Sequence, residues 1–106
     1  MKAYQEAIKI FEKHYDLVVL PLIKQKAYDD AAKGLGVVIP QIREDALRSV
    51  PRNVIDYYNG IITTAQDFQS FLGNSITDDG IKTFSESLEE CIREFNLALV
   101  KERLTD

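Results

Sequence analysis

Apolar residues recur at steps of three and four along the last part of the chain, over residues 75–104. That spacing places them on one face of an α-helix. Ser75 or Thr77 can supply the N-cap oxygen, and Asp78 with Asp79 puts negative charge at the positive end of the helix dipole. An amphipathic helix is therefore predicted here, and its apolar face comprises Ile81, Phe84, Leu88, Cys91, Ile92, Phe95 and Leu99.

The same spacing opens the chain, where an amphipathic helix is predicted to begin near Ala3. Its apolar face comprises Tyr4, Ala7, Ile8, Phe11, Tyr15, Val18, Val19 and Leu22. Over residues 17–23 the apolar side chains point to all sides of the axis, which is typical of a helix surrounded by protein. Pro21 removes one backbone hydrogen bond there, so we expect a helix that bends at Pro21 but continues, and that ends at Gly34.

The middle of the chain shows weaker periodicity. Residues 34–39 are expected to form a short apolar linker, and residues 40–49 a short helix, because proline suits a first helical turn. Ser49 and Pro51 signal the start of a third long helix that closes at Gly73 and Asn74. Its apolar face comprises Val54, Tyr58, Ile61, Ala65, Phe68 and Leu72.

These elements predict an all-α fold. Long helices joined by tight connections favour an antiparallel helical bundle, with three long helices, the first kinked at Pro21, and one short helix. A chain of 106 residues has the size of one domain, so residues 1–106 are expected to form a single helical-bundle domain.

Charge and composition narrow the choice of partners. The chain has 17 acidic and 13 basic side chains, a net charge of −4, and no basic run, so nucleic acid is not expected as a partner. An acidic surface favours a basic protein partner instead.

The sequence also indicates where the protein is expected to be found. Its longest apolar run spans residues 17–23, well short of the roughly 20 residues that cross a bilayer, so no membrane is expected as a partner. A single cysteine and a polar start without a signal peptide favour the cytoplasm.

Few residues suggest a catalytic or metal-binding site. His14 is the one histidine and has no glutamate three residues before it, so the paired motif of a di-iron bundle is missing. Residues 75–86 resemble a calcium loop in part, but a helix N-terminus rich in capping residues explains them better. Cys91 lies on a core face, away from any evident base. We therefore expect no enzyme, no cofactor and no metal.

Two surfaces remain as candidates. Acidic and aromatic residues on the last two long helices suggest an anchor for a basic partner, and they are Asp56, Tyr57, Glu86, Glu90 and Glu94. At the end of the last helix, Leu97, Val100 and Leu104 lie away from its core face and suggest self-association instead. A third stripe is formed by Tyr57, Thr64 and Phe71. The simpler expectation for this stripe and for the apolar end of the last helix is that the first two helices cover them; the alternative is a protein-binding surface.

The pair Tyr57 and Tyr58 beside Asp56 resembles the paired tyrosines of colicin-type DNase immunity proteins over these three residues. This resemblance implies an inhibitor that occupies a toxin or nuclease. The leading hypothesis is thus an acidic inhibitor or immunity or antitoxin-type protein. The alternatives are a homodimeric scaffold or regulator, and a small-ligand carrier or enzyme that uses the segment around Pro21 as a pocket wall.

Overall fold

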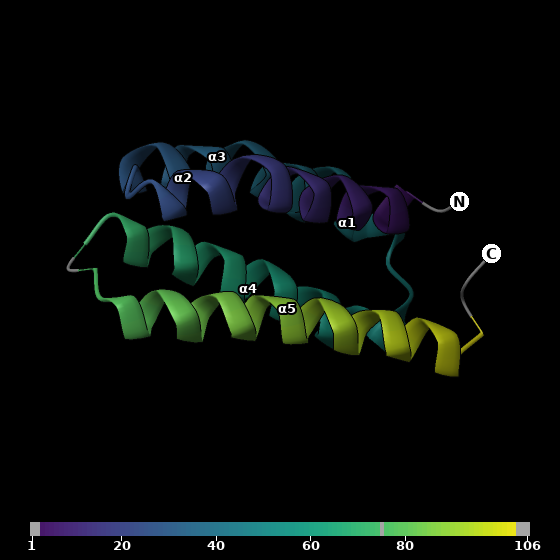
Figure 1. Cartoon of the computed structure of the whole chain (residues 1–106). Coiled ribbons are helices and arrows are strands. Elements are labelled where there is room, and N and C mark those ends of the chain that lie inside the picture. The colour runs from purple at the N-terminus through teal and green to yellow at the C-terminus, as the bar shows by residue number, and fades with distance from the viewer. Residues whose placement is uncertain (1–2, 75, 104–106) are drawn as a thin grey trace.

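The computed structural model describes residues 3–74 and 76–103, apart from the side chain of Asp45. Over these residues the chain is all-α, without a strand, and forms an antiparallel helical bundle 40 × 22 × 19 Å in extent (Figure 1). The predicted fold class is confirmed. In chain order the elements are α1 (Ala3–His14), the π-helical η1 (Tyr15–Val19), α2 (Leu20–Lys24), α3 (Tyr28–Pro40), the π-helical η2 (Gln41–Asp45), the 3-10 turns η3 (Leu47–Ser49) and η4 (Arg52–Val54), α4 (Ile55–Leu72) and α5 (Asp78–Lys101).

The helices lie in two layers (Figure 1). In one layer α1 and α2 lie beside α3, and in the other α4 packs along α5, while contacts between α3 and α4 join the layers. The backbones of α1 and α5 approach each other less closely than the backbones of α1 and α3, of α3 and α4, or of α4 and α5. The side of the bundle between α1 and α5 is therefore the most open one.

The first helical run continues across Pro21. Leu20 donates its N–H to the Tyr15 carbonyl in the wider π-helical pattern of η1, and every residue between Asp16 and Ile23 is helical. Proline lacks the N–H that an α-helix would use, and a π-turn is one way to rearrange the bonds around such a gap. The prediction that the helix continues through Pro21 is confirmed.

This run ends at Lys24, earlier than predicted. Lys26 has a φ of 62°, in the left-handed region. Its N–H donates to the Ile23 carbonyl at 2.9 Å, and the N–H of Ala27 donates to the Leu22 carbonyl at 2.8 Å. These two bonds form a Schellman motif, which usually has glycine at the left-handed position. The predicted end was wrong because lysine occupies this position and gives no stop signal.

Gly34 and Gly36 lie inside α3, so the predicted helix end and the predicted linker were both wrong here. A Cβ added to Gly34 would lie 3.3 Å from Val19 Cγ2, and one added to Gly36 would lie 2.8 Å from Gln69 Nε2. Gln69 Nε2 donates to the Ala32 carbonyl at 3.2 Å. These glycines thus allow α3 to approach η1 and α4 closely, and they do not form a turn.

Pro40 ends α3, and the backbone continues into η2, so residues 40–49 do not form a separate short helix. The missing N–H of Pro40 removes one α-helical bond, and the helix widens into π-helical turns after it. A 3-10 turn follows, in which Ser49 Oγ donates to the Ala46 carbonyl at 2.7 Å. The predicted short helix is thus the irregular end of the second helical run.

The second half of the chain follows the prediction closely. A 3-10 turn after Pro51 leads into α4, and Gly73 is its C-cap. Thr77 caps α5, since its Oγ1 accepts the N–H of Gly80 at 3.0 Å. Glu86 lies inside α5, so this segment is a capped helix N-terminus, as expected. Ser75 lies outside the described residues.

An aromatic cluster fills the core between the layers. The ring centroid of Phe95 lies 6.2 Å from that of Tyr4 and 5.4 Å from that of Tyr58. Tyr58 is fully buried and donates its hydroxyl to the Ile42 carbonyl at 2.6 Å. These large side chains fill the space between α1, α4 and α5, which explains the wide separation of α1 and α5.

Candidate functional site

Large apolar side chains are exposed at seven described positions, in two groups. One group lies on α1, η1 and α3 and comprises Ile10, Leu17, Val18 and Val37; we call it the outer patch. The other group lies on α4 and α5 and comprises Tyr57, Leu97 and Val100. The expectation that residues 17–23 are surrounded by protein was wrong at Leu17 and Val18, because Tyr15 and Val19, rather than these two residues, lie on the side of η1 that packs into the core.

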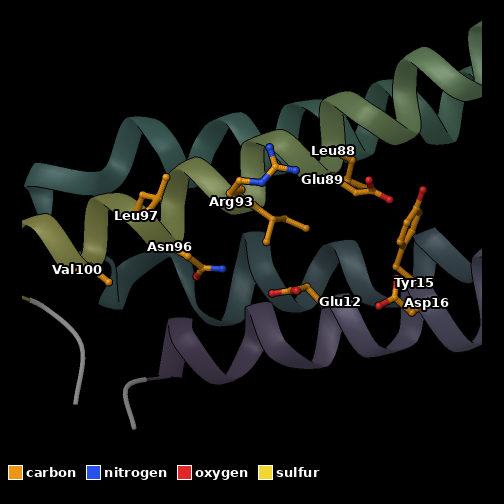
Figure 2. Close-up of a pocket in the computed structure, with 10 residues that line it drawn as sticks. Glu12, Tyr15, Asp16, Leu88, Glu89, Arg93, Asn96, Leu97 and Val100 are labelled. Atoms are coloured by element: carbon orange, nitrogen blue, oxygen red, sulfur yellow. The ribbon is translucent and has the colours of Figure 1, made fainter.

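An open groove of about 460 Å³ lies between α1 and α5, and we call it the α1–α5 groove. Figure 2 shows Tyr15 reaching from the first helical run toward α5 across this opening, with Glu12 at its edge. Its apolar side chains are Tyr15, Leu88, Ile92, Leu97 and Val100. Its polar side chains are Glu12, Asp16, Glu89, Arg93 and Asn96. The groove therefore combines an apolar floor with a rim that is mostly acidic.

The carboxyl of Glu12 on this rim has a raised pKa. Burial and the neighbouring carboxylate of Asp16 raise the pKa of Glu12, and Lys9 one turn earlier lowers it by less. Among the described residues, no hydrogen bond or ion pair holds the Glu12 carboxylate. Glu12 is thus partly desolvated in its charged form, without a cation in direct contact.

Tyr15 connects the two sides of the groove. Its hydroxyl lies 2.9 Å from Ser85 Oγ on α5, within hydrogen-bond distance. Burial raises the pKa of Tyr15, so the hydroxyl stays neutral over the physiological range. This bond fixes the end of the groove at which Leu88 and Glu89 lie.

A second hollow, also of about 460 Å³, lies beside the first, between the start of α4 and the end of α5. We call it the Tyr57 hollow, and its lining residues are Asn53, Tyr57, Glu94, Leu97, Ala98, Lys101 and Glu102. Leu97 belongs to both hollows. The surface expected to bind a partner and the surface expected to self-associate therefore meet at Leu97.

The predicted partner-binding residues are only partly brought together. Tyr57 and Glu94 lie in one hollow, and Tyr57 is 46% exposed. Glu86, Glu90 and Asp56 are exposed but line neither hollow, and Glu90 forms an ion pair with Arg93.

The predicted self-association residues Leu97 and Val100 are each 62% exposed. Leu104 lies outside the described residues.

The remaining part of the predicted α4 stripe is covered by α5. Thr64 Oγ1 lies 3.5 Å from Cys91 Sγ, and the ring centroids of Phe71 and Phe84 are 5.0 Å apart. Tyr57, by contrast, lies near the start of α4 and remains exposed. The expectation that the first two helices cover this stripe was wrong because α5 lies along it.

Neighbouring tyrosines have different surroundings. Tyr58 is buried against Phe95, so Tyr57 is the one member of the pair at the surface. Burial raises the pKa of Tyr58. A paired contact of both tyrosines with one partner, which the resemblance to immunity proteins implies, does not fit this arrangement.

The acidic rim of the groove was missed in the sequence. In the sequence, Glu12 and Asp16 lie with Lys9 and Lys13 on the polar face of the first amphipathic helix, which predicts a solvated surface. In the structure, Glu12 and Asp16 face the groove together with Glu89 of α5. The available signal was their spacing of one helical turn beside the apolar face, but the sequence alone does not show which helix faces that flank.

Other chemistry-bearing side chains have structural contacts. His14 is half-buried, and its Nε2 lies 3.0 Å from the Gly34 carbonyl oxygen. Within residues 3–74 and 76–103, no three His, Cys, Asp or Glu side chains are placed to hold a metal ion. In the same part of the chain, every helix is too short or too polar to cross a lipid bilayer.

Comparison with known proteins gave no relative. The chain matches no protein-family model, no curated protein and no solved structure.

Proposed function

We propose that this chain is a small acidic protein-binding module of the cytoplasm. It occupies a basic protein partner, such as a toxin or nuclease, in the manner of an inhibitor or of an immunity or antitoxin protein. The observation that carries the proposal is the Tyr57 hollow, where two exposed apolar side chains, Tyr57 and Leu97, lie beside the carboxylate of Glu94.

The composition of this surface supports the proposal. Binding energy at interfaces is concentrated in a few apolar and aromatic anchors, which are enclosed by polar residues that exclude water. Tyr57 and Leu97 have the size for such anchors, and Glu94 with Glu102 supplies acidic neighbours. The net charge of −4 adds an attraction for a basic partner at longer range.

The proposal includes no catalytic residue, cofactor, metal, nucleic acid or membrane. The polar groups of the α1–α5 groove are carboxylates, one arginine, one asparagine and the Tyr15 hydroxyl, which Ser85 holds. Their arrangement around an apolar floor supports recognition of a surface, without a nucleophile placed beside a base.

Affinity capture from the native source tests this function. Wild type, Tyr57→Ala and Leu97→Ala serve as baits, with Leu17→Ala as the matched control because Leu17 is 65% exposed and Leu97 is 62% exposed. We expect one basic protein to be retained by wild type and Leu17→Ala and lost with Tyr57→Ala and Leu97→Ala. Retention by all four baits, or by none, contradicts the proposal.

A second candidate function is homodimerisation through the end of α5. It rests on Leu97 and Val100, whose exposure along one helix edge is the same. Replacing Leu97 and Leu104 with Glu then gives a monomer of unchanged helicity. Sedimentation and circular dichroism measure both properties, and a wild type that is already monomeric contradicts this candidate.

A further inference from the structure

We propose that the α1–α5 groove holds a basic amphipathic helix of the partner, whose lysines or arginines contact Glu12, Asp16 and Glu89. This inference rests on the proposed function and gives the partner its chemistry. The neighbouring Tyr57 hollow shares Leu97 with the groove, so one partner can extend over both.

The length of the groove suits a short helix. Along α5 it extends from Leu88 to Val100, which at 1.5 Å per residue is a distance of about 18 Å, or roughly three helical turns. Both walls are helices, and the described residues include no sheet edge to which a strand could be added. A helix laid between two helices is therefore the occupant that this geometry accommodates.

The apolar side chains of the groove favour an apolar stripe on that helix, because two of them are exposed. Leu88, Ile92 and Tyr15 form the buried floor, while Leu97 and Val100 are exposed at one end. Apolar side chains at positions i, i+3 or i+4, and i+7 of a docked helix would pack along this row and would remove Leu97 and Val100 from water.

The charge of the rim requires basic residues beside that stripe. Glu12 and Asp16 lie on one side of the groove and Glu89 on the other, against a single basic side chain, Arg93. Arg93 is already paired with Glu90 outside the groove. Positive side chains on both flanks of a docked helix would thus meet carboxylates on both rims.

Glu12 supplies independent support. Its carboxylate is half-buried, lies near Asp16 and has no direct cation partner among the described residues. The charge of Glu12 therefore lowers the stability of the folded protein when no partner is bound. A cation from a partner would compensate this cost. A residue that is unfavourable in the free protein but favourable in a complex is typical of a binding site.

A synthetic helix tests the proposal without knowledge of the partner. The probe is a fluorescent peptide of about 14 residues, slightly longer than the groove, with leucines at helical spacing and lysines on both flanks of that stripe. A peptide of the same composition in scrambled order controls for non-specific attraction to an acidic protein. We expect fluorescence anisotropy to show binding of the amphipathic peptide at least about tenfold tighter than that of the scrambled one.

Matched variants locate the binding. Glu12→Gln should weaken peptide binding about tenfold, while Glu86→Gln, which removes the same charge outside the groove, should change it by less than about twofold. Leu97→Glu should abolish binding, while Val37→Glu on the α3 side of the outer patch should retain it, since Val37 is similarly exposed and, among the described residues, lines no hollow with Glu12 or Asp16. Thermal melting of free Glu12→Gln, expected at or above the wild-type temperature, separates a binding role from a structural one.

Any one of three results would contradict the groove proposal. The first is equal binding of both peptides, and the second is an equal loss of binding with Glu86→Gln and Glu12→Gln. The third is a wild-type dimer that Leu97→Glu dissociates, because a second copy of the chain would then occupy the groove.

If one of these results is found while capture of a basic protein still depends on Tyr57, the groove proposal fails and the proposed function stands. If that capture also fails, both are wrong.

Discussion

The α1–α5 groove and the outer patch both expose aliphatic side chains, but they differ in shape and in charge. The groove has a volume of about 460 Å³ and three carboxylates on its rim. The outer patch has a smaller hollow of about 290 Å³ in which Lys13 is the one charged side chain, and at its edge Leu17 also borders a hollow with Lys9, Glu12, Lys13 and Asp16. The comparison shows that exposure alone does not distinguish a candidate site, whereas an apolar hollow with a mostly acidic rim does.

The two regions also differ in what forms them. The groove exists because large aromatic side chains hold α1 away from α5, whereas the outer patch lies where α1 and α3 are in close contact at Gly34. The shape of the groove therefore depends on the core, and that of the outer patch depends on backbone proximity.

The largest effect should come from the core beneath the groove. Phe95→Ala removes the ring that contacts both Tyr4 and Tyr58, so the free energy of unfolding should fall by about 3–5 kcal/mol. Leu17→Ala in the outer patch should change it by less than about 0.5 kcal/mol. Urea denaturation measures both, and similar values for the two variants would remove the distinction between the regions.

The second effect concerns affinity. Once a partner is captured, Tyr57→Ala should cost about 2 kcal/mol of binding free energy, mainly through faster dissociation, because a central aromatic anchor is lost. Leu17→Ala should leave affinity unchanged. Isothermal titration calorimetry gives the values, and a larger loss with Leu17→Ala would move the site to the outer patch.

The third effect is kinetic. Changing Glu86, Glu90 and Glu94 to Gln should slow association several-fold at low salt and change dissociation little, because exposed carboxylates steer a basic partner without anchoring it. The difference should shrink as salt rises. Stopped-flow mixing measures both rates, and an unchanged association rate would mean that these residues form an ordinary solvated surface.

The smallest effect is on the stability of the free protein. A folded-state pKa raised above the ordinary 4.5 means that Glu12 favours folding below that pH, and that this contribution is lost as pH rises through the raised value. Glu12→Gln should therefore melt at a slightly higher temperature than wild type at neutral pH, with the difference disappearing in acid. The charged groups that line a hollow together with Glu12 are Lys9, Lys13, Asp16, Glu89 and Arg93.

Glu6→Gln is the control for that comparison. Glu6 lies in the first turn of α1, where a carboxylate interacts favourably with the positive end of the helix dipole. Glu6→Gln should therefore melt at a slightly lower temperature than wild type. A shift of the same sign for both variants at neutral pH would show that burial of Glu12 has no cost.

The fold could be predicted from the sequence where helix ends carry chemical signals. Thr77 with the aspartates after it fixes the start of α5, and Gly73 fixes the end of α4. The error in the first half arose because Lys26 takes a left-handed conformation that usually signals glycine, while Gly34 serves close packing. Local propensity does not distinguish a glycine that ends a helix from one that allows two helices to touch.

The candidate site could be predicted only in part. Periodicity placed Leu97 and Val100 away from the core, and both are exposed. It did not indicate that Glu12 and Glu89 would line the same groove, since that depends on which helices become neighbours across the open side of the bundle. Such a juxtaposition is decided by the connections and by the volume of the aromatic core, neither of which is readable from a single helix.

The most direct test of the account is methyl NMR of the leucine- and valine-labelled protein with its captured partner. Leu97 and Val100 line the groove, and Leu17, Val18 and Val37 belong to the outer patch, so one spectrum reports on both regions. We predict that the partner shifts or broadens the methyl signals of Leu97 and Val100 and leaves those of the outer patch unchanged. Changes confined to Leu17, Val18 and Val37 would contradict the account.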